Sequence, residues 1–187
     1  MANPMRDKIV KVVAAIDPLD ELEREHRDSA IEWIRSGAPI FRTKKPDVPP
    51  KHLVSYFALV DEQCGKLLLV DHKLADLWLP SGGHVEPDEA PDATVVRELS
   101  EELNLAADFM HAGPLFITVT RTRKDGGHTD VSLWYLIRGD SSRAIEFDRS
   151  EFHGVRWFGF DEIPFERTDS HMRRFVTKMR ALVLIDH

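Results

Sequence analysis

The segment from residue 130 to residue 137, DVSLWYLI, is apolar along both of its faces. Side chains alternate across a β-strand. One face would then carry Val131, Leu133, Tyr135 and Ile137. The other face would carry Ser132, Trp134 and Leu136. A strand that is apolar on both faces is typical of a sheet covered by helices on both sides. The sequence therefore predicts an α/β fold with a sheet between helical layers.

Further runs of strand and helix residues supply the rest of such a fold. Strands are expected at residues 52–60, 66–70, 77–80, 115–121 and 155–158. A helix is expected over residues 91–103, with Asn104 as a left-handed C-cap, and the periodicity of residues 170–185 predicts a helix that packs on the sheet. Gly82 and Gly83, which lack a Cβ, are expected to allow a tight turn and a close approach of the backbone to a ligand.

Two amphipathic helices are expected before residue 41, because Asn3 and Asp17 each precede a proline, as N-cap residues do, and Gly37 is placed as a stop. We expect their apolar stripes, to which Leu19 and Leu22 belong, to pack on their own domain. The alternative is a partner surface or a homodimer. Three prolines and three lysines at 42–51 indicate a linker. The predicted domains are a helical extension (1–41), the linker (42–51) and a catalytic domain (52–187).

Composition limits the classes of function. The chain has 187 residues, and its net charge of −7 gives no basic field for long nucleic acid. The single cysteine, Cys64, excludes an internal disulfide framework and a cysteine zinc site, and it is expected in a turn. We find no signal-peptide pattern and no apolar run of the ~18 residues that a membrane span needs, so a cytoplasmic protein without a membrane partner is expected.

Three glutamates, Glu98, Glu101 and Glu102, fall on one face of the helix expected at 91–103. Like charges at this spacing destabilise a helix, and a bound cation would offset the cost. Carboxylates without histidine or cysteine favour Mg²⁺ or Mn²⁺ over zinc. Because protein-bound Mg²⁺ is commonly shared with substrate phosphates, a phosphate compound is the expected substrate. Apolar positions of the helix, Val96 among them, are expected in the core.

The same segment resembles a known family motif. Its matching residues are Gly83, Glu89, Arg97, Glu98, Leu99, Glu101, Glu102 and Leu105. They fit the Nudix box, G-x5-E-x7-R-E-U-x-E-E-x-G-U, in which U is aliphatic. Only Asn104 departs from it, where the family has glycine. The chain is thus similar to MutT-like Nudix hydrolases.

The resemblance implies a hydrolase of a nucleoside diphosphate linked to another moiety, on an α/β/α sandwich with a mixed sheet. Carried over by position, the metal ligands would be Glu98, Glu101, Glu102 and the carbonyl of Gly82. The catalytic set would be Glu98 as a candidate base, Arg97 to orient Glu98 and Glu101, and Glu151. Glu151 is chosen because it precedes Trp157 by six residues. Gly83 and Glu89 would border the substrate.

The substrate is assigned by elimination within the family. The chain lacks the proline, tyrosine and SQPWPFPxS patterns that mark its ADP-ribose, dinucleoside polyphosphate and NADH hydrolases. This leaves a nucleoside triphosphate, normal or oxidised, cleaved to monophosphate and pyrophosphate. Two alternatives stay open: hydrolysis of ADP-ribose or another nucleotide sugar, and a regulatory module that senses a nucleotide.

Several other polar and aromatic residues are given structural roles. His84, His128 and His171 are expected on loops or the surface, although each could contact phosphate. Phe57, Trp78, Phe116 and Trp134 are expected in the core rather than stacked on a base. Asp130 is expected to form a turn or an N-cap.

Overall fold

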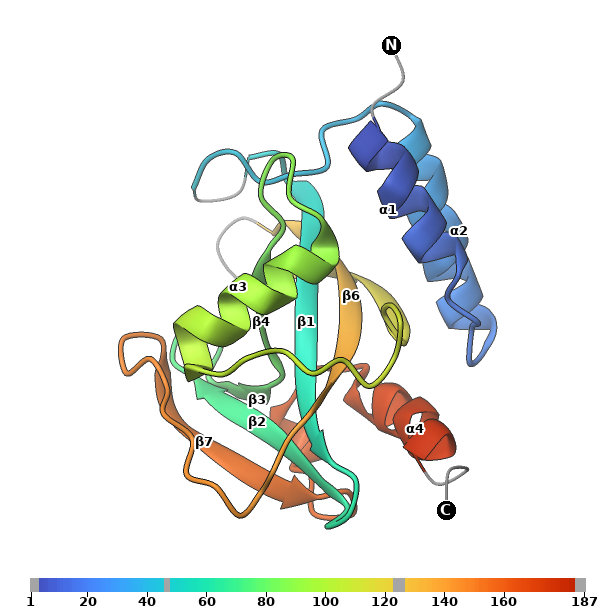
Figure 1. Cartoon of the computed structure of the whole chain (residues 1–187). Helices are drawn as coiled ribbons and strands as arrows, with labels where there is room; N and C mark the ends of the chain where they lie inside the picture. Colours follow the sequence, from blue (N-terminus) through green and yellow to red (C-terminus); the bar gives the residue numbers. More distant parts are fainter. Residues whose placement is uncertain (1–3, 46–47, 123–126, 184–187) are drawn as a thin grey trace.

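The computed structural model describes residues 4–45, 48–122 and 127–183, and in these residues a seven-stranded sheet is surrounded by four α-helices (Figure 1). The elements are, in chain order, α1 (Pro4–Ala14), α2 (Glu21–Arg35), β1 (Lys51–Asp61), β2 (Lys66–His72), β3 (Leu77–Leu79), β4 (Ser81–His84), α3 (Pro91–Leu103), β5 (Phe116–Arg121), β6 (Thr129–Arg138), β7 (Phe152–Gly159), the 3₁₀ helix η1 (Phe165–Arg167) and α4 (Met172–Val183).

Strand β1 is the centre of the sheet. One edge of β1 pairs in parallel with β6, from Lys51 opposite Thr129 to Val60 opposite Arg138. The other edge pairs antiparallel with β4 along its middle, from Val54 to Phe57, and with β2 at its end. β3 and β7 join the sheet through β2, and β5 joins it through β6. This combination confirms the mixed sheet that the resemblance implies.

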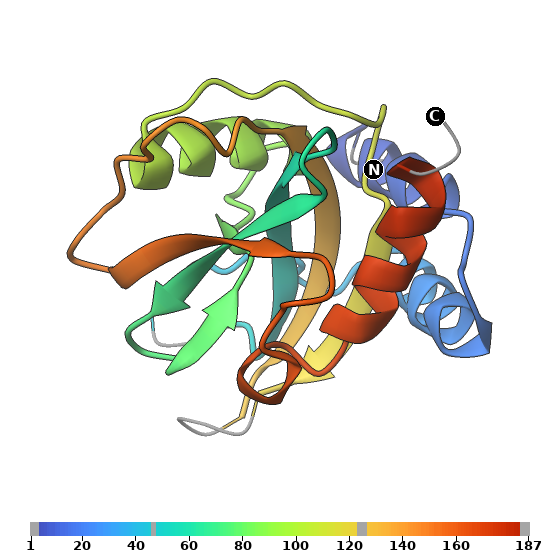
Figure 2. The ribbon, with the colours of Figure 1, turned by 90° about the horizontal axis from the view of Figure 1, so that it is seen from below.

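Helices cover both faces of the sheet, as the apolar pattern of residues 130–137 predicts. Leu133 of β6 belongs to one buried cluster together with Leu99 of α3, whereas Trp134 belongs to a second cluster together with Phe175 of α4. Figures 1 and 2 show α3 and α4 on opposite sides of β1 and β6. The predicted α/β/α sandwich is therefore confirmed.

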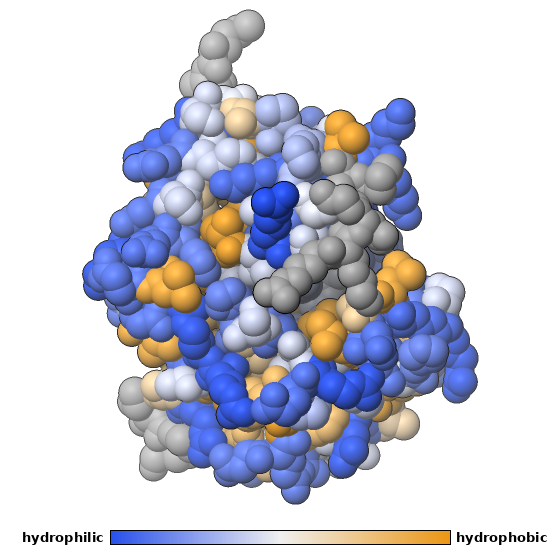
Figure 3. Space-filling view, turned by 180° about the vertical axis from the view of Figure 1, so that it is seen from behind, coloured by the Kyte–Doolittle hydropathy of each residue, from blue (hydrophilic) through white to orange (hydrophobic). Residues whose placement is uncertain are grey.

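The N-terminal helices pack on their own domain. α2 contacts the edge strand β5, and the apolar stripes of α1 and α2 enter the same buried cluster as α3 (Figure 2). Ile9, Val13, Ala30 and Ile34 are fully buried there. The alternative of a homodimer through these helices stays a prediction. On the face seen in Figure 3, hydrophobic residues form only small separate patches among hydrophilic ones.

A buried ion pair connects the N-terminal helices to the rest of the chain. Glu23 of α2 is fully buried, and its Oε1 accepts a hydrogen bond from Lys178 Nζ of α4 at 2.7 Å. The same oxygen lies 3.3 Å from the backbone N–H of Ile117 in β5, which donates to it. One carboxylate therefore joins three elements that are far apart in the sequence.

The start of α2 differs from the prediction. Asp20, not Asp17, is the N-cap, and its Oδ1 accepts from the backbone N–H of Glu23 at 2.9 Å. Glu23 reaches back to accept from the N–H of Leu19 at 2.6 Å. This reciprocal pair caps a helix better than Asp17 could, and it moves the helix start to residue 21. Asn3, the other predicted N-cap, lies outside the described residues.

Four other expectations can be compared with the structure. Gly82 and Gly83 lie in strand β4 and not in a turn, because β4 pairs with β1. Val96 is 48% exposed, and Leu19 and Leu22 are also exposed, so these three residues do not belong to the core. Asn104 is left-handed, with φ 51° and ψ 40°, which confirms the predicted C-cap. In the three described ranges, no helix is long and apolar enough to cross a bilayer.

Candidate active site

A cleft of about 970 Å³ opens where β4, the end of β2 and the middle of α3 meet the loops that precede β1, β3 and β7. It is lined by both acidic and basic side chains. The lining residues are Arg42, Lys45, His72, Lys73, Leu74, Gly82, Gly83, His84, Glu86, Arg97, Glu98, Glu102, Ser150 and Glu151. The cleft therefore offers sites for cations and for anions side by side.

The two glycines of β4 bring the backbone close to the carboxylates. A Cβ on Gly83 would lie 1.9 Å from Glu98 Oε1, so this glutamate rests directly on the strand. Gly82 has φ +152°, and a Cβ there would lie 2.2 Å from the Ser55 carbonyl oxygen of β1. Neither position tolerates a side chain without a shift of its neighbours. This explains the two glycines better than the predicted turn does.

Arg97 holds the loop and the helix together. Its Nε and Nη2 donate to the two carboxylate oxygens of Glu89 at 2.9 and 3.0 Å, which is a bidentate pair. Its Nη1 donates to Glu98 Oε1 at 2.6 Å. Its Nη2 also lies 3.3 Å from the carbonyl oxygen of His84, which accepts from it. Arg97 thus fixes the direction in which Glu98 points.

Glu102 is the most buried carboxylate of the cleft, with 7% exposure. Burial, together with the negative charges of Glu98 and Glu151, raises the pKa of Glu102 to about 8, although Ser81 Oγ donates a hydrogen bond to it. Burial also raises the pKa of Glu98, in spite of its contact with Arg97. Burial and mutual repulsion therefore disfavour the charged forms of both carboxylates, and a bound cation would favour them.

The structure brings together most, but not all, of the predicted carboxylates. Glu98, Glu102 and Glu151 line the one cleft although Glu151 is far from the others in the sequence. The Glu101 side chain is 61% exposed and lies outside this lining, with its Oε2 3.5 Å from Arg97 Nη1. Glu101 is therefore at the rim of the carboxylate group.

Several lining residues were missed in the sequence. Arg42 and Lys45 come from the segment interpreted as a linker, and Lys73 comes from the turn after β2. The signal for the first two was the run RTKK, whose positive charge was read only as a property of a linker. Arginine and lysine side chains are common ligands of phosphate groups.

Of the polar and aromatic residues that were given structural roles, some lie where they were predicted and others do not. Phe57, Phe116 and Trp134 are buried, as predicted. His84 was expected on a loop or the surface, but it lies in β4 and lines the cleft. Asp130 forms neither a turn nor an N-cap. It lies in β6 with its Oδ1 3.0 Å from Nε2 of His52, a residue that sequence reasoning did not consider.

Comparison with known proteins agrees with this geometry. A family model described as NUDIX domain matches residues 50–179. A MutT-like protein of Streptomyces ambofaciens is 30% identical over 115 residues, which cover 62% of this chain and 69% of that protein. The CTP pyrophosphohydrolase of Escherichia coli K12 is 41% identical over 59 residues, 29% of this chain and 44% of that protein.

The fold has a similar solved structure as well. A MutT NUDIX hydrolase from Burkholderia pseudomallei superimposes with a TM-score of 0.57 at 23% identity, and the match covers 67% of this chain and 95% of that one. The family model spans well over half of the chain and includes the glycines, Arg97 and the glutamates of the cleft. The chain therefore belongs to the Nudix family, as its box predicts, and is a hydrolase of diphosphate bonds.

Proposed function

We propose that this Nudix hydrolase cleaves a nucleoside triphosphate, normal or oxidised, to a nucleoside monophosphate and pyrophosphate. The observation that carries the proposal is the composition of the cleft. Glu98, Glu102 and Glu151 converge there, and Arg42, Lys45 and Lys73 line the same cavity. A polyphosphate would suit both kinds of side chain. Cations would bridge its phosphates to the carboxylates, and the basic side chains would bind the remaining phosphate oxygens.

The donor set fits Mg²⁺ or Mn²⁺. All its side-chain donors are carboxylate oxygens, which hard cations prefer. The absence of a side chain at Gly83 leaves Glu98 against the backbone of β4, and burial, together with the charges of Glu98 and Glu151, raises the pKa of Glu102. In this proposal Glu98, Glu101 and Glu102, with the carbonyl of Gly82, hold the metal. Bound there, the ion would neutralise phosphate charge and lower the pKa of a water molecule.

The protein groups have separate tasks in the proposed reaction. The oxygen of a water molecule forms a bond to phosphorus, and the bridging P–O bond between the α- and β-phosphates breaks, with its electron pair leaving on the bridging oxygen. The water proton passes to a carboxylate, Glu98 or Glu151, both of which face the cleft. Arg97 is a positioning residue, since it bonds Glu98 and Glu89 and does not need to touch the substrate.

The names of two relatives agree with a triphosphate substrate, since one is MutT-like and the other is a CTP pyrophosphohydrolase. The alternatives are a nucleotide-sugar hydrolase and a nucleotide sensor. They differ from the proposal in products. A triphosphate hydrolase releases pyrophosphate, a nucleotide-sugar hydrolase releases two monophosphates, and a sensor binds without turnover.

The test is a product assay with Mg²⁺ on normal and oxidised nucleoside triphosphates, ADP-ribose and dinucleoside polyphosphates. We expect pyrophosphate, without free phosphate, from at least one triphosphate, and this release should be lost in Glu102→Gln. Glu166→Gln is the matched control, because the Glu166 side chain is 96% exposed and lies outside the cleft. Turnover of ADP-ribose alone, or nucleotide binding without turnover, would refute the proposal in favour of the corresponding alternative.

A further inference from the structure

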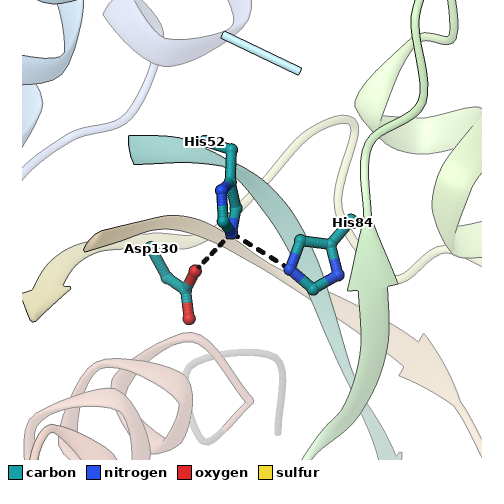
Figure 4. A group of neighbouring side chains, drawn as sticks. All are labelled: His52, His84 and Asp130. Carbon is teal, nitrogen blue, oxygen red and sulfur yellow. Dashed lines mark hydrogen bonds and ion pairs between the residues drawn. The ribbon is translucent and has the colours of Figure 1, made fainter. Parts of the chain in front are cut away.

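Two histidines and an aspartate meet beside the cleft, at the first residues of β1 and β6 and the last residue of β4 (Figure 4). His52 lies opposite Asp130 in the parallel pair of β1 and β6. His84 lies opposite Val54 in the antiparallel pair of β1 and β4. The Nε2 atom of His52 is 3.0 Å from Asp130 Oδ1 and 3.1 Å from His84 Nε2.

The hydrogen bond on the far side of the His52 ring determines its tautomer. His52 Nδ1 is 2.9 Å from the carbonyl oxygen of Pro49. A carbonyl oxygen can only accept, so Nδ1 carries a proton and donates it. In the neutral ring, Nε2 then holds a lone pair that points toward His84 and Asp130. A backbone carbonyl that orients an imidazole in this way is the usual support of a histidine metal ligand.

The ionised Asp130 carboxylate, which faces His52 Nε2, can only accept hydrogen bonds. Asp130 Oδ1 is buried and, in spite of its short distance to His52, has no hydrogen bond of acceptable geometry within the described ranges. His52 itself is fully buried. A single proton on His52 Nε2 could be donated in a hydrogen bond to Asp130 Oδ1 or to His84 Nε2, but not to both. A cation at this point would satisfy all three groups at once.

We propose that His52, His84 and Asp130 bind a zinc-type divalent ion. Their three ligand atoms all lie within 4.8 Å of one another. In a tetrahedral zinc site with bonds of about 2.0–2.2 Å, neighbouring ligand atoms are about 3.3 Å apart, so a small opening of the group admits the ion. Two imidazoles and a carboxylate suit zinc, whereas the all-oxygen group at Glu98 and Glu102 suits magnesium.

A further histidine stands next to this group. His128 Nε2 is 3.4 Å from Asp130 Oδ1, and its ring stacks on that of His52 with the centroids 5.2 Å apart. His128 Nδ1 is 3.1 Å from the hydroxyl of Thr122. Three protein ligands leave one position of a tetrahedral ion for water or for His128.

The ion would join three strands at the wall of the cleft. His84 lines the cleft, its carbonyl accepts from Arg97, and it follows the two glycines directly. Metal binding would therefore stabilise the end of β4, on which Glu98 rests. The inference does not depend on which substrate the enzyme hydrolyses, since its ligands are different residues from the carboxylates of the cleft.

The experiment is a metal titration of the stripped full chain, with Zn²⁺ and with Co²⁺ as a visible probe, in excess Mg²⁺. The background is the Glu98→Gln/Glu102→Gln variant, which removes the carboxylate site. We expect one equivalent of Zn²⁺ to bind in this background, with a rise in Tm and a tetrahedral Co²⁺ spectrum. His84→Asn in the same background should weaken binding by at least about tenfold, since even the loss of a supporting partner costs about 10–100-fold.

His111→Asn is the matched control, because His111 is an exposed loop residue outside the group. It should bind Zn²⁺ like the parent. Asp130→Asn, which nearly keeps the shape of the aspartate side chain, is a second ligand variant. It replaces His84→Asn in the test if circular dichroism shows that His84→Asn is unfolded. The proposal is overturned if the parent variant binds no Zn²⁺ or Co²⁺, or if the folded ligand variants bind both ions as well as His111→Asn does.

Discussion

Glu98 lies against the backbone of Gly83 so closely that a Cβ on residue 83 would come within 1.9 Å of its Oε1. The contact joins strand β4 to the middle of α3. It sets the position of the carboxylate that Arg97 then orients at 2.6 Å. The geometry of the proposed metal site therefore depends on the lack of a side chain at residue 83.

Gly83→Ala should displace Glu98 and lower kcat while the fold remains. Because a shift of about 1 Å in a catalytic group costs on the order of 100-fold, we expect a loss of that size. Steady-state kinetics, with Tm measured in parallel, checks this. Gly113→Ala is the control, because a Cβ at Gly113 would meet nothing within 4 Å. Equal activity of the two variants would contradict the role given to the contact.

Arg97→Lys should lower kcat more than it changes KM. Lysine cannot form the two-pronged contact with Glu89 or keep Glu98 in place at the same time. Loss of a supporting partner of a metal ligand costs about 10–100-fold. Activity and Mg²⁺ affinity should fall together, and an unchanged Mg²⁺ affinity would show that Arg97 acts in another way.

The metal-free protein should lose stability as the pH rises from about 4.5 to about 8. Burial and neighbouring charge raise the pKa of Glu102 from 4.5 to about 8, so over this range the folded state keeps a proton that the unfolded state has released. Stability falls where the native state binds more protons, by up to about 1.4 kcal/mol per pH unit for one group. Urea unfolding in EDTA at several pH values measures the slope.

Glu102→Gln is the control for this pH dependence. The amide does not ionise, so the slope between these pH values should be shallower in the variant, and the variant should be the more stable protein at pH 8 without metal. An identical slope in the variant and the wild type would assign the pH dependence to other groups.

Lys178→Met should destabilise the fold by about 3–5 kcal/mol, because it leaves the fully buried Glu23 carboxylate without its charged partner. Glu23→Gln/Lys178→Met removes both charges and should recover part of the loss. A double-mutant cycle in urea measures the coupling. If the single variant cost no more than a surface substitution, the extension would not be held by this pair.

The sequence predicted the layers of the fold better than it predicted the site. The two apolar faces of residues 130–137 required helices on both sides of the sheet, and the periodicity of residues 91–103 matched α3 residue for residue. Strand β4 was not predicted, because SGGH has little intrinsic strand propensity and its pairing with β1 is a tertiary effect. The domain boundaries expected at residues 41 and 52 stay a prediction.

Only part of the site could be predicted from the sequence, for a related reason. Fixed spacing within one helix identifies Glu98 and Glu102, whereas His52 and Asp130 meet only through the register of two strands that are far apart in the sequence. No periodicity of a single segment carries that information. Arg42 and Lys45 reach the cleft from a proline-rich segment whose path the sequence does not determine. The roles given to Glu98, Glu101, Glu102, Glu151 and Gly82 stay predictions.

The most direct test of the central claim is the initial rate of pyrophosphate release from a triphosphate as Mg²⁺ is titrated, in the wild type, Glu102→Gln and Glu166→Gln. We predict saturation with Mg²⁺ in the wild type and in Glu166→Gln, and a rate lower by at least about 100-fold, with weaker Mg²⁺ dependence, in Glu102→Gln. A Glu102→Gln enzyme with the full rate and the same Mg²⁺ dependence would contradict the assignment of the cleft carboxylates as the metal site.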